Sequence, residues 1–152
     1  MSLGRVLPLV LFVLLALGGG GLIGLTVETG GWYAGLDKPS FNPPDWAFGV
    51  VWTILYICIG IAGWRVWRAG AGDLQTLWWA QLVVNFSWPP VFFAAQALAL
   101  AIALILALDV LIVLFIARAW ARERIAALLF VPYALWTGYA SALNIAIWWM
   151  NR

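Results

Sequence analysis

The sequence predicts an all-α integral membrane protein in which five transmembrane helices form one up-and-down bundle. Apolar residues make up 66% of the 152 residues and charged residues only 9%, with a mean hydropathy of +1.01. Soluble domains carry about 25% charged residues, so this chain has too few to cover a water-exposed surface. The apolar residues also fall into five runs, each close to the roughly 20 residues that a membrane-spanning helix needs.

The five predicted spans cover about residues 6–27, 46–66, 74–93, 97–117 and 125–149. Backbone polar groups must pair within each segment in hydrocarbon, so runs of this length are helical. Short connections make successive helices antiparallel, and we expect one domain over residues 1–152. The first run follows Arg5 as in a signal peptide, but it is longer than a typical signal core and lacks a clean cleavage site. We therefore expect it to remain as a span.

The composition also excludes several classes of protein and site. The apolar content excludes a cytosolic enzyme, a disordered regulator and a nucleic-acid binder. The few basic residues also form no patch of the kind that tracks the phosphates of a nucleic acid. Cys58 is the only cysteine and there is no histidine. We therefore expect no metal site and no resident cofactor.

The basic residues predict the orientation. One face of a five-helix bundle would hold six of them: Arg5, Arg65, Arg68, Arg118, Arg122 and Arg124. The other face would hold Lys38 and Arg152. Because cytoplasmic loops carry the excess of arginine and lysine, the N-terminus is expected in the cytoplasm and the C-terminus outside. The long first loop, about residues 28–45, then lies outside.

That first loop is expected to act as a lid. It is rich in glycine and proline, and Pro39, Pro43 and Pro44 fix its backbone. It also carries Trp32, Tyr33, Phe41 and Trp46, so a stiff apolar loop would fold onto the bundle. The alternative is an aromatic belt at the membrane interface. Pro89 and Pro90 should bend the third span beneath it.

Three aromatic stripes point to the bundle interior. Trp52 and Tyr56 are four residues apart and share a helix face. On the third span, Gln81, Asn85, Trp88 and Phe92 share another face, and the amides should turn it inward. Trp136, Tyr139, Ala140 and Leu143 repeat the pattern on the fifth span. The stripes either fill the core or line a cavity for a flat apolar ligand.

Two further features each allow two interpretations. Gly20 and Gly24 form a small-residue step that permits close helix approach, either within the chain or in a dimer. Asp109 is an acid near the middle of the fourth span. An intramembrane carboxylate suggests either a transport role or a contact between helices.

Five motifs in order resemble the tryptophan-rich sensory protein/translocator protein family (TspO/MBR), also called the peripheral benzodiazepine receptor family. They span about residues 32–144 and read Trp32-Tyr33-x-x-Leu36-x-Lys38-Pro39, Pro43-Pro44-x-Trp46, Trp52-x-x-Leu55-Tyr56, Gln81-Leu82-x-x-Asn85-x-x-Trp88-x-Pro90-x-Phe92-Phe93 and Pro132-Tyr133-x-x-Trp136-x-x-x-Ala140-x-x-Leu143-Asn144. The resemblance implies a five-helix homodimer whose pocket opens beneath the first loop and binds porphyrins, sterols or benzodiazepine-site ligands.

The resemblance also implies which residues contact the ligand. They would be Tyr33, Pro43, Trp46, Trp52, Tyr56, Asn85, Trp88, Phe92, Trp136, Tyr139, Ala140 and Asn144. Trp52 and Trp136 would be the catalytic pair if the protein oxidises protoporphyrin in light. The family's sterol motif needs a tyrosine near the end of the fifth span, and none follows Leu143, which weakens the sterol expectation.

Three functions remain in competition. The first is a porphyrin-binding membrane receptor or carrier with a regulatory role in tetrapyrrole metabolism or stress. The second is a light-dependent, protoporphyrin-degrading enzyme, and the third is a small proton-coupled transporter that uses Asp109. The expected partners are a porphyrin or other flat apolar molecule, membrane lipid and a second copy of the chain, with no nucleic acid. We expect a bacterial envelope membrane rather than the mitochondrial outer membrane.

Overall fold

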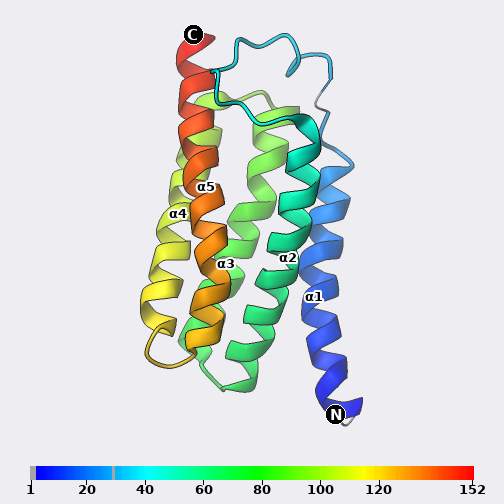
Figure 1. Ribbon diagram of the computed structural model, residues 1–152, viewed down its shortest axis with the longest axis vertical. Helices are drawn as coiled ribbons and strands as arrows, with labels where there is room; N and C mark the ends of the chain where they lie inside the picture. Colours follow the sequence, from blue (N-terminus) through cyan, green and yellow to red (C-terminus); the bar gives the residue numbers. More distant parts are fainter. Residues whose placement is uncertain (1–2, 29) are drawn as a thin grey trace.

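The computed structural model describes residues 3–28 and 30–152, and within these ranges it is helical without strands. The helices are α1 (Leu3–Gly24), α2 (Asp45–Arg68), α3 (Gly72–Pro89), α4 (Leu98–Ala119) and α5 (Arg124–Met150), with one π-helical turn, η1 (Pro90–Ala94), after α3. In Figure 1 the N-terminus lies at one end of the bundle and the C-terminus at the other. Of the described helices, α1, α2, α4 and α5 are long and apolar enough to cross a membrane.

Two helix ends follow from local chemistry. α1 ends at Gly24 rather than near Val27, because the Thr26 and Val27 amides donate to the carbonyls three residues back, those of Ile23 and Gly24, and close a turn. α3 ends at Pro89, and the chain continues as η1, since consecutive prolines remove two amide donors from the helical ladder. The expected interruption at Pro89 and Pro90 is confirmed.

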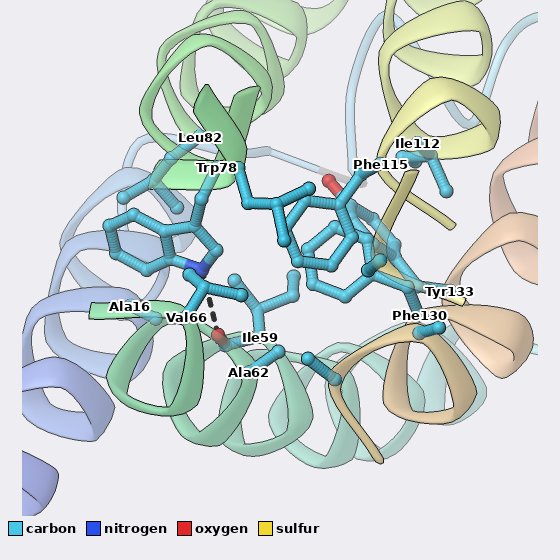
Figure 2. Packing of buried hydrophobic residues seen from close by; sticks show 14 of the residues in the cluster. Ala16, Ile59, Ala62, Val66, Trp78, Leu82, Ile112, Phe115, Phe130 and Tyr133 are labelled. Carbon is cyan, nitrogen blue, oxygen red and sulfur yellow. Dashed lines mark hydrogen bonds between the residues drawn. The ribbon is translucent and has the colours of Figure 1, made fainter. Parts of the chain in front are cut away.

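The helices are ordered α1, α2, α5, α4, α3 around the bundle, and α3 also contacts α1 and α2. Figure 2 shows the buried cluster at their centre, where Trp78 of α3 reaches across to α2. Its indole Nε1 donates a 2.8 Å hydrogen bond to the Ile59 carbonyl. On the α4–α5 side the Phe115 and Phe130 rings stack with centroids 4.0 Å apart. Aromatic rings therefore join helices that are distant in sequence.

Glycines allow α1 and α2 to approach closely. A Cβ added to Gly60 would lie 2.5 Å from the Val13 Cα, and one added to Gly20 would lie 2.1 Å from the Tyr56 ring. A Cβ on Gly24 would meet nothing within 4 Å. Of the two interpretations of the Gly20–Gly24 step, packing within the chain therefore holds for Gly20.

Ion pairs tie two connections together at the end of the bundle opposite the first loop. Arg65 Nε lies 2.8 Å from Glu123 Oε2, and Arg122 lies 2.7 Å from Asp73. The hydrogen bond from Arg122 lowers the pKa of Asp73, and the same contact raises the pKa of Arg122. The α2–α3 and α4–α5 connections thus share one end, as an up-and-down arrangement requires.

Candidate functional site

The loop between α1 and α2 lies across the other end of the bundle (Figure 1). Its Tyr33 is only 3% exposed, with ring centroids 6.1 Å from Phe92 and 5.3 Å from Phe93 of η1. The Tyr33 hydroxyl donates a 3.1 Å hydrogen bond to Asn42 Oδ1 within the loop. Burial, with a smaller effect of the Asp45 charge, raises the pKa of Tyr33 to about 12. The π-helical turn thus provides the aromatic surface on which the loop packs.

The end of α5 holds the same loop. The Asp37 amide donates to Asn151 Oδ1 at 3.0 Å, and Asn151 Nδ2 donates back to the Asp37 carbonyl at 2.9 Å. The Tyr139 hydroxyl donates to the Phe41 carbonyl. Backbone groups at two points of the loop are therefore paired with side chains of α5 and its C-cap.

A cavity of about 340 Å³ opens beside this covered end, between α1, α2, α3 and η1. Its volume lies within the range of small-molecule sites. Of the predicted site residues, Trp52, Tyr56 and Trp88 lie on its wall. Phe48 and Phe93, which were not predicted, lie there as well. The α1 side of the wall consists of small and aliphatic residues: Leu17, Gly20, Gly21, Ile23 and Gly24. The cavity is therefore aromatic on one side and aliphatic on the other, and α2 adds the polar residues Asp45 and Thr53 to its wall.

The aromatic wall is held in place from behind. The Trp52 and Tyr56 rings stack with centroids 5.3 Å apart. Trp88 Nε1 donates to Asn144 Oδ1 of α5 at 3.1 Å, and its ring lies 5.1 Å from Phe92. These contacts fix the positions of the large rings on the cavity wall.

A buried chain of polar groups continues inward from Tyr56. Its hydroxyl donates to Asn85 Oδ1 at 2.8 Å, and Asn85 Nδ2 donates to the Tyr133 hydroxyl at 2.7 Å. The Tyr133 hydroxyl in turn donates to Gln81 Oε1 at 2.8 Å. Gln81, Asn85 and Tyr133 are at most 2% exposed. Buried polar groups must be paired, so this network fixes the orientation of the cavity wall through α2, α3 and α5.

The α5 stripe lies elsewhere, contrary to the expectation that three stripes meet in one cavity. Trp136 lines a separate apolar groove of about 340 Å³ between α2 and α5, with Val51, Ile54 and Leu135. Its ring pairs with Phe48 and Tyr139, whereas the Trp52 ring pairs with Tyr56 and Tyr133. The Tyr133 ring packs edge-on against Trp52, with ring centroids 6.2 Å apart. Trp136 Nε1 is buried without an acceptor among the described residues.

The remaining predicted residues are not part of the cavity wall. Phe92, Ala140 and Asn144 are buried, Pro43 is half-buried in the loop, and Trp46 is 71% exposed. Asn85 acts from behind Tyr56. Sequence reasoning missed the contribution of α1 to the cavity, although the glycine run at Gly18–Gly21 marks a helix surface without side chains.

Asp109 closes a contact between α4 and α5. Ser141 Oγ donates a 2.6 Å hydrogen bond to Asp109 Oδ2. Asp109 Oδ1 is buried without a hydrogen-bond partner among the described residues. Of the two expectations for this acid, the interhelical contact is confirmed.

Comparison with known protein families identifies the family of this chain. The model of the TspO/MBR family matches residues 10–150, which is nearly the whole chain. The chain belongs to the TspO/MBR family. The resemblance drawn from the five motifs is thereby confirmed, and membership together with the apolar helices identifies an integral membrane protein.

Several TspO/MBR relatives are similar over most of their length. The tryptophan-rich protein TspO of Archaeoglobus fulgidus is 40% identical over 79% of this chain and 80% of its own. The translocator protein of Homo sapiens is 36% identical over 80% of this chain and 75% of its own. The tryptophan-rich sensory protein of Cereibacter sphaeroides is 35% identical over 94% of this chain and 91% of its own.

Proposed function

We propose that this TspO/MBR member is a membrane receptor or carrier that binds porphyrins in the cavity between α1, α2 and α3, with a regulatory role in tetrapyrrole metabolism or stress. The observation that carries the proposal is the wall formed by Trp52, Tyr56 and Trp88. Flat conjugated rings stack on aromatic faces. In the loop, Lys38 Nζ donates to the Ala34 and Leu36 carbonyls and Asn42 Nδ2 donates to the Pro43 carbonyl, so a propionate group would have to compete with these bonds. Relatives that are named translocator and sensory proteins favour a carrier or receptor.

Replacing Trp52 by phenylalanine tests this proposal. The substitution removes part of the stacking surface, so protoporphyrin affinity is expected to fall by about 1 kcal/mol, or roughly fivefold. Affinity is measured by quenching of the remaining tryptophans in purified protein. Trp79→Phe is the matched control, because Trp79 is 45% exposed and lies outside the cavity. Equal affinities for the two variants would contradict binding in this cavity.

Measuring the porphyrin affinity of a Trp136→Phe variant distinguishes the cavity from the α2–α5 groove. Trp136→Phe is expected to leave affinity nearly unchanged if the ligand occupies the α1–α2–α3 cavity. If Trp136→Phe weakens binding while Trp52→Phe does not, the ligand uses the α2–α5 groove instead. The proposal that Trp52 and Trp136 together degrade protoporphyrin in light requires both variants to lose light-dependent product.

We also propose that the loop between α1 and α2 is a lid over the cavity between α1, α2 and α3. Replacing Pro43 and Pro44 together by alanine gives the loop access to open states, which lowers the binding-competent fraction and the apparent affinity in proportion. We expect several-fold weaker porphyrin binding, mainly through faster dissociation. Proteolysis within residues 33–42 should quicken in this variant and slow again with ligand. If ligand protects the loop in neither protein, the loop is an interfacial belt.

We further propose that α3 and η1 together cross the membrane, in addition to α1, α2, α4 and α5. We also propose that the N-terminus is cytoplasmic. In a background without Cys58, a cysteine introduced at Ser40 should react with an impermeant thiol reagent added outside intact cells. One introduced at Gly72 should react only after the membrane is opened, because it lies at the opposite end of the bundle. The reverse pattern of labelling would contradict the proposed orientation.

The proposal also includes a homodimer in a bacterial envelope membrane, with sterols as secondary ligands. Exposed apolar residues along α1, including Leu7, Leu11 and Leu14, are available to lipid or to a second copy. Proton-coupled transport through Asp109 is the weaker alternative, since Asp109 already accepts a hydrogen bond from Ser141.

A further inference from the structure

The end of the bundle opposite the loop carries a second, polar pocket. It has a volume of about 210 Å³ and is lined by Trp64, Arg65, Arg68, Ala69 and Glu123. From Trp52, on the wall of the aromatic cavity, to Arg65 is about 20 Å along α2 at the rise of an α-helix. The two sites are therefore separate, and the polar pocket has no part in the proposed porphyrin site.

The guanidinium groups in this pocket are only partly paired with acidic side chains of the described residues. Arg65 uses Nε to bind Glu123 Oε2, so one carboxylate is balanced while the terminal nitrogens of Arg65 have no acceptor among the described residues. Arg68 lies over the Trp64 ring with its guanidinium carbon 5.3 Å from the ring centroid. It makes no ion pair with a described residue. Trp64 is 8% exposed and forms a rigid floor for that guanidinium.

The surroundings of the pocket are basic. Arg118, Arg122 and Arg124 lie at the same end, and among the described side chains there only Asp73 and Glu123 are acidic. The partial negative charge at the C-terminal end of α2 disfavours an anion at this position. That partial charge is smaller than one full charge, and the two arginines of the pocket outweigh it. The net field therefore favours an anion.

We propose that this pocket binds the phosphate group of an anionic phospholipid from the surrounding leaflet. A planar guanidinium binds phosphate oxygens in a bidentate manner, and Arg65 and Arg68 bring two such groups to one small pocket. Basic pockets between helices at a membrane surface are suited to anionic headgroups, and Trp64 and Trp67 place this one at interface depth. Soluble phosphate shares the recognition chemistry, but it lacks the acyl chains that the exposed apolar flank of α2 would cover.

Thermal unfolding of the purified full chain in detergent tests the proposal. A ligand that binds only the folded state raises the midpoint, and the rise grows with the logarithm of its concentration relative to its Kd. Short-chain phosphatidylglycerol should raise the midpoint, whereas phosphatidylcholine of the same chain length should not. Inorganic phosphate at the same concentration should also have no effect. An equal rise with phosphatidylcholine, or with inorganic phosphate, would overturn the proposal.

Matched variants locate the site. Arg68→Gln should weaken the apparent affinity for phosphatidylglycerol about tenfold, while Arg118→Gln should change it less than twofold. Both arginines are exposed at the same end of the bundle, both variants lose one charge, and only Arg68 lines the pocket. Arg68→Lys should recover part of the loss. Equal losses in the Arg68→Gln and Arg118→Gln variants would show a general charge effect and overturn the proposed pocket.

Discussion

Replacing Gly60 by alanine should separate α1 from α2 and lower the free energy of unfolding by at least about 1–3 kcal/mol. The added Cβ would lie 2.5 Å from Val13 Cα and 2.9 Å from the Phe12 carbonyl oxygen. Both contacts are with backbone, which cannot move aside as a flexible side chain can. The loss is measured as a lower midpoint of thermal unfolding in detergent.

The same substitution should also weaken porphyrin binding, because α1 forms one wall of the cavity. Gly138→Ala is the matched control, since it lies in a helix and its Cβ would meet nothing within 4 Å. Alanine is the better helix former, so this control should be unchanged or more stable by up to about 1 kcal/mol. If Gly60→Ala is as stable as Gly138→Ala, the close approach of α1 and α2 is wrong.

Replacing Asn85 by leucine should disrupt the buried polar network. The Tyr56 hydroxyl would lose its acceptor and the Tyr133 hydroxyl would lose one donor. Each buried polar group left unpaired costs about 1–3 kcal/mol of stability. We also expect weaker porphyrin binding, because the Tyr56 ring would no longer be held against Trp52. Unfolding in detergent and tryptophan quenching measure the two effects.

A double-mutant cycle separates the network from simple loss of packing. Tyr56→Phe removes the hydroxyl that donates a hydrogen bond to Asn85. The double variant Tyr56→Phe/Asn85→Leu should therefore lose less stability than the sum of the losses in the two single variants, and the difference should be about 0.5–3 kcal/mol. Ser87→Ala, an exposed hydroxyl on the same helix, should change stability by at most about 0.5 kcal/mol. Strictly additive single variants would contradict coupling through Asn85.

Features with a local cause could be predicted from the sequence. The helical class follows from apolar runs in hydrocarbon, and the break at Pro89 and Pro90 follows from missing amide donors. The amides Gln81 and Asn85 were expected to face inward, and both are buried. In each case the decisive interaction lies within one helix or depends only on its polarity.

Features that depend on how helices rotate against one another could not be predicted. Periodicity places Trp52 and Trp136 on inward faces, but it does not say which of them meets Tyr133. In the structure Tyr133 packs against Trp52, and its hydroxyl is hydrogen-bonded to two amides of α3. Trp136 lies in a separate groove between α2 and α5. The α1 wall was missed for a related reason, because glycines have no side chain whose pattern would mark a cavity.

The clamp between Asn151 and Asp37 has a consequence for the order of biosynthesis. Its two hydrogen bonds join residues 114 positions apart, and Asn151 follows the last turn of α5. A nascent chain translated as far as Met150 contains every helix and the complete wall of the cavity. It does not yet contain the side chain that fixes the loop at Asp37. Attachment of the loop at Asp37 therefore has to follow synthesis of all five α-helices, whereas the residues that hold the loop at Tyr33 and Phe41 are all translated before Asn151.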